Sequence, residues 1–428
     1  MKRLPQRRWA ILLLALMSSA AAASEESSPN MFSLSGFGTL GIAHSSATDA
    51  DFVSNFNQPN GAGFTHRWSP GVDSKLGLQL DAHFTQQWSA VVQVVAQHQY
   101  DNHYGPQIEW ANLKYQWTPD LSVRAGRTVS DFFMVSDSGL VSYTYPWVRP
   151  PLEVYGLLPV NHKDGVDVAY RFRLAQASDS LRASYGGNTI KIPGGGESTG
   201  RQFFYVTDTL EYEAATLRIG YASLKLDYYI PDIEGLFEGL TSFGNELSAI
   251  PGLGAAGAQA TGLANRYSLA GIPFRIITIG ASFDPGDWLL MAEWTHSPVA
   301  QAFCEVTAWY VTAGYRIGRF TPYLTYAQVR PHPIVEPGIS VSGLPPALAQ
   351  DATGLSDGLS EVLNAFAESQ KNLSAGVRWD FVRNAALKLQ VERLTTGSNS
   401  TGLLTNVQPG FQPGDGATVF SATIDFVL

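Results

Sequence analysis

The sequence is poor in cysteine, in charge and in long apolar runs. Its one cysteine, Cys304, excludes a disulfide framework within one chain and a cysteine-based zinc site. Only 15% of the 428 residues are charged, and 37 acidic residues outnumber 28 basic ones, which gives no support to nucleic-acid binding. No stretch of 18 apolar residues occurs, so the sequence contains no candidate membrane-spanning helix.

Catalytic and metal-binding patterns are also scarce. None of the eight histidines belongs to a His-Glu-x-x-His pattern. His98 and His103 could bind a metal from a short loop, but without partners at fixed spacing they are better explained as solvent-exposed loop residues. No nucleophile–base pair can be assembled from the sequence. We therefore expect no catalytic step, no metal site and no cofactor.

The first 23 residues follow the order of a secretory signal peptide. Residues 1–8 carry four basic side chains, residues 9–17 are apolar, and small residues follow up to Ala23. We expect cleavage after Ala23, which leaves residues 24–428 as the mature protein. Without the four N-terminal basic residues its net charge is 24 − 37 = −13.

Segments of about ten residues that alternate apolar and polar side chains recur along the rest of the chain. In one of them, Leu76, Leu78 and Leu80 share one face, while Gln79 and Asp81 share the other. Such segments match a tilted crossing of a bilayer better than the strands of about five or six residues in soluble sandwiches. We predict sixteen strands, at residues 32–43, 72–84, 88–97, 107–117, 121–127, 165–174, 180–190, 202–212, 215–228, 274–283, 288–296, 304–317, 320–329, 371–381, 385–394 and 418–427.

The connections between these strands alternate in length. Short turns follow the even-numbered strands, for example at residues 118–120, 284–287, 318–319 and 383–384. Long connections follow most odd-numbered strands, at residues 44–71, 128–164, 230–273, 330–370 and 395–417. Trp and Tyr at strand ends are typical of interfacial girdles. Together these features predict an all-β protein, a 16-stranded antiparallel transmembrane β-barrel that partners with outer-membrane lipid.

Three stretches carry a family resemblance: residues 32–41 (FSLSGFGTLG), residues 73–77 (DSKLG) followed by Gln93-Val94, and residues 146–151 (PWVRPP). They resemble the first three strands and the third loop of Gram-negative outer-membrane porins. The resemblance implies a homotrimer in the cell outer membrane, reached by export through the periplasm, and a third loop folded into the barrel. The sequence departs from the family pattern in its last residue, Leu428, and in lacking the acidic motif of the general porins' third loop.

The predicted inward faces suggest what lines the pore. The basic residues assigned to the lining are Arg124, Arg171, Arg173, Arg182, Arg218 and Lys225. The third long connection, residues 128–164, is the expected constriction loop, and the charges assigned to it are Asp131, Asp137, Arg149 and Glu153. A basic wall facing an acidic loop would set a transverse field across the waist. We therefore expect a passive, water-filled diffusion channel for small hydrophilic solutes and ions, with a lean towards anions.

The same residues allow two further interpretations. Each lining arginine could simply be a solvated residue paired with a neighbouring carboxylate. The long loops could instead make the protein a surface receptor or adhesin built on a closed barrel. One of these loops has regular structure of its own, because residues 356–370 have helical spacing and predict a short helix packed over the mouth.

Overall fold

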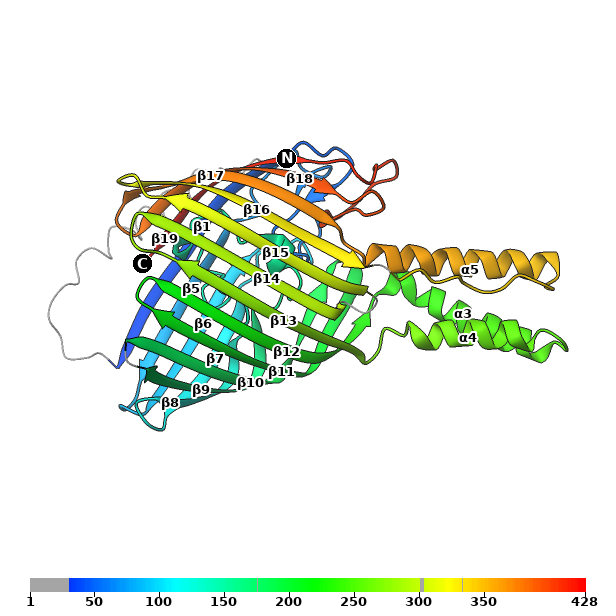
Figure 1. The fold of residues 1–428 in the computed structure, drawn as a ribbon, viewed down its shortest axis with the longest axis horizontal. Coiled ribbons are helices and arrows are strands. Elements are labelled where there is room, and N and C mark those ends of the chain that lie inside the picture. The colour runs from blue at the N-terminus through cyan, green and yellow to red at the C-terminus, as the bar shows by residue number, and fades with distance from the viewer. Residues whose placement is uncertain (1–30, 175, 301–303, 333) are drawn as a thin grey trace, which may run out of the picture.

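Sixteen long antiparallel strands close into one barrel (Figure 1). The computed structural model describes residues 31–428 except 175, 301–303 and 333, so the predicted signal peptide lies outside the described residues. Strands adjacent in sequence pair with each other, and β1 closes the barrel by pairing with β19. The strands are β1 (Phe32–Ser45), β5 (Lys75–His83), β6 (Trp88–Gln97), β7 (Gln107–Gln116), β8 (Leu121–Val129), β9 (His162–Leu174), β10 (Ala177–Ile192), β11 (Gly196–Tyr212), β12 (Ala215–Tyr229), β13 (Ile272–Phe283), β14 (Trp288–Ala300), β15 (Cys304–Tyr315), β16 (Phe320–His332), β17 (Gln370–Val382), β18 (Ala385–Thr396) and β19 (Thr418–Val427).

The prediction of a sixteen-stranded antiparallel barrel is confirmed. The predicted strands match the observed ones most closely at the end of the barrel with short turns. At the end with long loops several strands continue further: β11 begins at Gly196 instead of residue 202, and β14 runs to Ala300 instead of residue 296. Beyond a bilayer the outer face of a strand meets water, so the alternation that predicts strand ends is lost there.

The apolar faces of the strands point outward. Leu34, Leu78 and Ile424 are 73%, 51% and 41% exposed, whereas Thr39 and Asp425, on the inward face, are buried. Thr39 of β1 donates a hydrogen bond of 2.7 Å to Asp425 of β19 inside the barrel. Exposed apolar side chains around a polar interior are the arrangement that a lipid environment requires.

The long connections carry the remaining elements. The first contains three short strands, β2 (Asp51–Phe52), β3 (Ala62–Gly63) and β4 (Trp68–Ser69), the last of which pairs with β1. The helical segments are η3 (Ser142–Thr144), α2 (Leu152–Tyr155), η4 (Pro193–Gly195), α3 (Pro231–Ala249), α4 (Gly254–Arg266) and α5 (Pro346–Ala365). In the described part of the chain, no helix combines the length and the hydropathy needed to cross a membrane.

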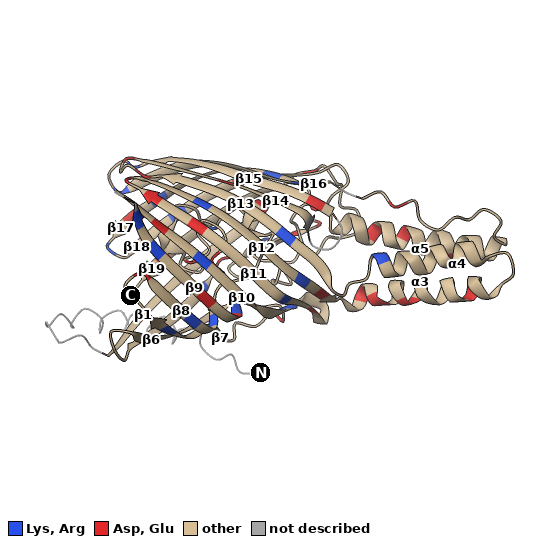
Figure 2. Ribbon diagram, turned by 60° about the horizontal axis from the view of Figure 1, so that its bottom comes forward, with Lys and Arg blue, Asp and Glu red and all other residues tan. Residues whose placement is uncertain are grey.

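Helices α3, α4 and α5 form a bundle that extends away from the long-loop end of the barrel (Figure 1). Leu240 and Leu247 of α3, Leu263 of α4 and Leu359 of α5 are buried in a core of their own. Acidic residues are spread along α3 and α5 (Figure 2). Helix α4 has one basic residue, Arg266. The predicted short helix at residues 356–370 is therefore corrected: α5 starts ten residues earlier and projects outward, because its apolar side packs on α3 and α4 instead of on the mouth.

Candidate functional site

The third long connection, residues 130–161, folds into the barrel as predicted, and we call it the inner loop. It leaves β8 and returns to β9, with η3 and α2 inside it. Its groups bond to inward-facing side chains on β10, β12 and every strand from β14 to β19. A loop held at so many points of the wall divides the lumen.

The first anchor of the inner loop is Asp131, which meets the basic wall directly. Its carboxylate pairs with Arg182 of β10 and with Arg218 of β12, whose Nη1 lies 2.7 Å from Oδ1. Burial disfavours the charged carboxylate, but the two guanidinium groups hold the pKa of Asp131 below its usual value. We expected an acidic loop facing a basic wall across a gap. For Asp131 the two are in contact, so this group sets no field across the lumen.

The second anchor is Arg149, on the opposite side of the barrel. It is buried, binds both carboxylate oxygens of Asp73 just before β5, and also pairs with Glu392 of β18. Its Nη2 donates a further hydrogen bond of 2.7 Å to Ser421 Oγ of β19. Arg149 was predicted to be a charge of the constriction. Arg149 is instead a buried ion-pair contact that fixes the loop, because both acidic partners point into the barrel beside it.

The other two predicted loop charges differ in exposure. Glu153 of α2 is fully buried, and Gln370 Nε2 donates a hydrogen bond of 2.8 Å to its carboxyl group. Burial raises the pKa of Glu153 to about 7. Asp137 is exposed and forms no ion pair with any residue that the structure describes. Of the predicted loop acids, Asp137 alone keeps an exposed side chain.

Polar contacts also fix the middle of the inner loop. Trp147 Nε1 donates hydrogen bonds of 3.0 Å to Thr312 of β15 and Thr325 of β16. Lys388 of β18 donates to the carbonyl oxygens of Ser142 and Trp147, at 2.6 and 2.7 Å. Buried donors that all find acceptors give the loop one defined position.

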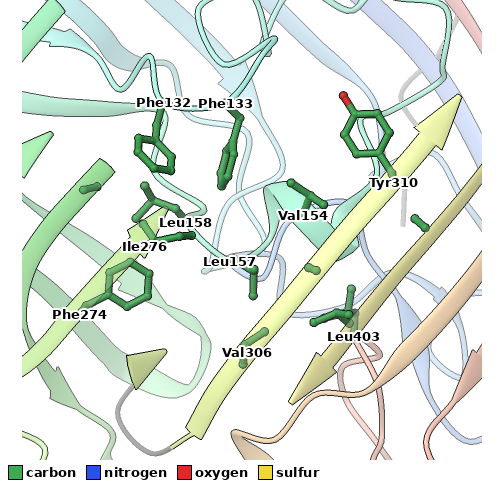
Figure 3. Packing of buried hydrophobic residues seen from close by; sticks show 14 of the residues in the cluster. Phe132, Phe133, Val154, Leu157, Leu158, Phe274, Ile276, Val306, Tyr310 and Leu403 are labelled. Carbon is green, nitrogen blue, oxygen red and sulfur yellow. The ribbon is translucent and has the colours of Figure 1, made fainter. Parts of the chain in front are cut away.

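One side of the inner loop packs as a hydrophobic core against the barrel wall (Figure 3). Phe132 and Leu158 of the loop lie near Phe274 and Ile276 of β13, and Leu157 lies near Val306 of β15. This part of the lumen is therefore filled with apolar side chains rather than open to solutes.

A cationic cavity lies near the short turns. Its volume is about 160 Å³, and it is lined by Arg124, Arg171 and Arg182 from the predicted set. Arg124 pairs with Asp167 at 3.1 Å, whereas Arg171 makes no ion pair with a described residue. These side chains come from β8, β9 and β10, whose inward faces meet because the strands are neighbours.

The other predicted lining residues lie elsewhere. Arg218 is buried beneath the inner loop, and Arg173 shares the face of Arg171 but is absent from the cavity lining. Lys225 corrects the prediction: it is exposed and alternates with the buried, inward-facing Leu224 and Leu226, so it points out of the barrel. We assumed that a charged residue faces inward, which fails where a strand rises above the bilayer.

Sequence reasoning missed Lys114, which joins the cationic cavity from β7. The signal was present, because Lys114 shares the polar face of Asn112 and Gln116, opposite the apolar Leu113.

Two Gly-x-Ser-x-Gly stretches, centred on Ser198 and Ser356, also escaped the sequence analysis. Ser198 lies within β11 and Ser356 within α5, where its Oγ donates to the carbonyl oxygen of Ala352. A nucleophile elbow requires a strand-to-helix turn, so neither serine has that context.

Comparison with known proteins identifies the architecture only. No family model matches the chain, and no curated protein matches its sequence. Solved structures do match. An outer membrane channel, DcaP of Acinetobacter baumannii, aligns with TM-score 0.54 and 12% identity over 93% of this chain and 99% of that one. An anion-selective porin from Comamonas acidovorans aligns with TM-score 0.52 and 13% identity over 93% and 99%. Salmonella typhi OmpF, in complex with daunomycin, aligns with TM-score 0.51 and 12% identity over 92% and 97%. The chain therefore has a porin-like fold.

Proposed function

We propose that this protein is a channel of a Gram-negative outer membrane through which small hydrophilic solutes and ions diffuse passively, with no chemical step. The observation that carries the proposal is the charge of the cavity near the short turns. Lys114, Arg124, Arg171 and Arg182 line it with Asp120 as the one acidic residue. Arg124 and Arg182 are paired with Asp167 and Asp131 outside the lining, so the positive charge without an ion-pair partner among the described residues is that of Lys114 and Arg171. An excess of positive charge in a confined space concentrates anions and repels cations. We therefore propose a preference for anionic solutes, because local charge outweighs net charge in controlling permeation.

The arrangement of the inner loop supports a route along one side of the lumen. A second cavity, of about 150 Å³, lies between the inner loop and the wall near β5 and β6, with Lys75 in its lining. The opposite side, along β11 to β16, is occupied by apolar packing. Solutes would then pass along β5 to β10, between the inner loop and the basic wall.

The outer surface supports the proposed environment and assembly. Leu34 and Leu40 of β1 and Phe420 of β19 are exposed apolar side chains suited to lipid or to another barrel. We propose a homotrimer that packs through the first and last strands. Light scattering of the detergent-purified protein, corrected for bound detergent, tests this: three copies support the proposal, and one copy overturns it.

Single-channel recording in a planar bilayer tests the channel itself. We expect stepwise ohmic current and, under a salt gradient, a reversal potential of the sign that anion preference gives. Replacing both Arg124 and Arg171 with Ala should lower anion over cation permeability. Lys225→Ala is the matched control, since it removes a positive charge from the outer face. Equal selectivity in all three proteins would remove the basic wall from the mechanism.

The helical bundle favours a second candidate function, a surface receptor or adhesin on a closed barrel. A bundle with its own core, extended beyond the barrel, is suited to contact a partner. This candidate predicts no current from correctly folded protein, so the same recording separates it from the channel.

A further inference from the structure

The inner wall at the long-loop end is apolar, which reverses the pattern at membrane depth. On β12, Leu224 and Leu226 are buried and point inward, while Lys225 between them is exposed. On β13, Phe274 points inward and Arg275 is exposed. Above a bilayer the outer face of a strand meets water, so polar residues outside and apolar ones inside are the pattern of a soluble protein. A wall that only enclosed water would have no need for leucine and phenylalanine facing inward.

These side chains line a cavity that the inner loop leaves unfilled. Its volume is about 340 Å³, within the range of sites that hold small organic molecules. The ends of β10 to β13 form one wall, and the inner loop forms the floor. The first long connection and the segment between α5 and β17 complete the lining. The main apolar contributors are Leu157, Leu158, Ile190, Leu224, Leu226 and Phe366.

One carboxyl group stands in this apolar lining. Glu368 is the one charged side chain among the described residues of the cavity, and it forms no ion pair with any of them. Burial raises the pKa of Glu368 to about 8, because the ionised form is poorly solvated there. In the part of the chain that the structure describes, the ionised carboxylate has no cation beside it, and it lacks full hydration in this cavity. A ligand with a positive charge would stabilise the ionised form by forming an ion pair with it.

We propose that this cavity binds an amphiphilic cation, with a protonated amine at Glu368 and an apolar body against Leu224 and Leu226. An anion would face the carboxylate, and a sugar would lose its hydrogen bonds to water against these leucines. The rings of Phe366 and Tyr228, whose centroids are 6.1 Å apart, add aromatic surface suited to a cation.

The inference goes beyond the proposed function, because the cationic cavity near the short turns disfavours the passage of a cation. We therefore propose a ligand that is held at the mouth rather than conducted.

Binding to nanodisc-reconstituted protein tests the site, with 1-naphthylmethylamine as the fluorescent probe and empty nanodiscs to subtract partitioning into lipid. The neutral 1-naphthalenemethanol and the anionic 1-naphthoate have the same naphthalene ring as the amine and serve as controls for its positive charge. We expect saturable amine binding that Glu368→Gln weakens about tenfold or more, as loss of a charge-assisted hydrogen bond implies. Glu361→Gln, the same change at an exposed position of α5, should leave affinity unchanged. Ala365→Trp, which adds bulk to the cavity lining, should block binding.

Equal amine affinity in the wild type and Glu368→Gln, or tighter binding of the neutral or anionic probe, would overturn the proposal. Current recorded from the same preparation separates it from the proposed channel function. A conducting protein without amine binding overturns the site alone. A protein that binds the amine but carries no current overturns the channel alone.

Discussion

Arg149 of the inner loop binds Asp73, at the end of the first long connection just before β5, through two parallel hydrogen bonds. Nε lies 2.8 Å from Oδ1 and Nη2 lies 2.7 Å from Oδ2, although the residues are 76 positions apart. Paired guanidinium and carboxylate groups fix direction as well as distance. Because Asp131 holds the loop to the opposite wall through Arg218, the inner loop is tied at both sides of the lumen.

Releasing the Arg149 link should loosen the inner loop and destabilise the barrel. Arg149→Ala removes the ion-pair partner of the buried Asp73 and Glu392, and removing one partner of a buried pair costs about 3–5 kcal/mol. We expect a lower thermal midpoint of barrel unfolding, followed by the gel mobility of unheated samples, and larger fluctuations of the open-channel current. Adding Asp73→Asn to Arg149→Ala should restore part of the midpoint, since it removes one unpaired charge. An unchanged midpoint in the single variant would contradict the anchoring role.

Asp131→Asn should make the channel more selective for anions. In the wild type the carboxylate of Asp131 neutralises positive charge on Arg182 and Arg218, and the substitution removes that negative charge. The reversal potential under a salt gradient should move further in the anion-selective direction, while Arg124 and Arg171 remain in place. Asp227→Asn is the matched control, because that residue pairs with Arg201 on the outer face. A shift towards cations, or an equal shift in both variants, would mean that Asp131 does not compensate charge along the solute path.

The barrel could be predicted from the sequence because lipid imposes a period of two on every strand that it touches. The prediction failed where that constraint ends. Lys225 was assigned inward because it is charged, yet above the bilayer polar residues face outward. The contacts of Asp131 and Arg149 could not be derived, since they join the loop to strands far away in sequence. Helix α4 was missed because its many Gly and Ala residues weaken the apolar stripe that marks a helix. Helix α3 was missed although its signal was present, since Leu240, Phe243 and Leu247 recur at helical spacing.

The helical bundle should unfold without the barrel. Leu240 is fully buried in the bundle core, and replacing a buried leucine with alanine costs about 2–5 kcal/mol. We expect Leu240→Ala to expose α3 to limited proteolysis while unheated gel mobility and unitary conductance stay at wild-type values. Leu324→Ala, at a lipid-facing position of β16, controls for the loss of a leucine as such. Loss of the barrel band together with the bundle would show that the two parts fold as one unit.

Glu368→Gln should stabilise the ligand-free protein at high pH and leave it unchanged at low pH. The pKa of Glu368 is about 8 in the folded state against an ordinary value of 4.5, so the folded state keeps a proton that the unfolded state has lost. Stability contributed by this group is therefore present below about pH 4.5 and is lost as the pH rises towards 8. Glutamine cannot ionise, so the Glu368→Gln variant does not lose this folding stability as the pH rises. The thermal midpoint of Glu368→Gln minus that of the wild type should be near zero at pH 4 and positive at pH 9.

Comparing midpoint differences cancels the titration of groups that do not interact with Glu368, such as Glu153, because both proteins share them. Glu361→Gln lies on exposed α5 surface and should give the same difference at both pH values. Adding saturating 1-naphthylmethylamine at pH 8 should raise the wild-type midpoint more than that of Glu368→Gln, because the cation offsets the cost of the ionised carboxylate. A midpoint difference that is the same at pH 4 and pH 9 would show that the carboxyl group is solvated, and would leave the cavity without the charge that selects a cation.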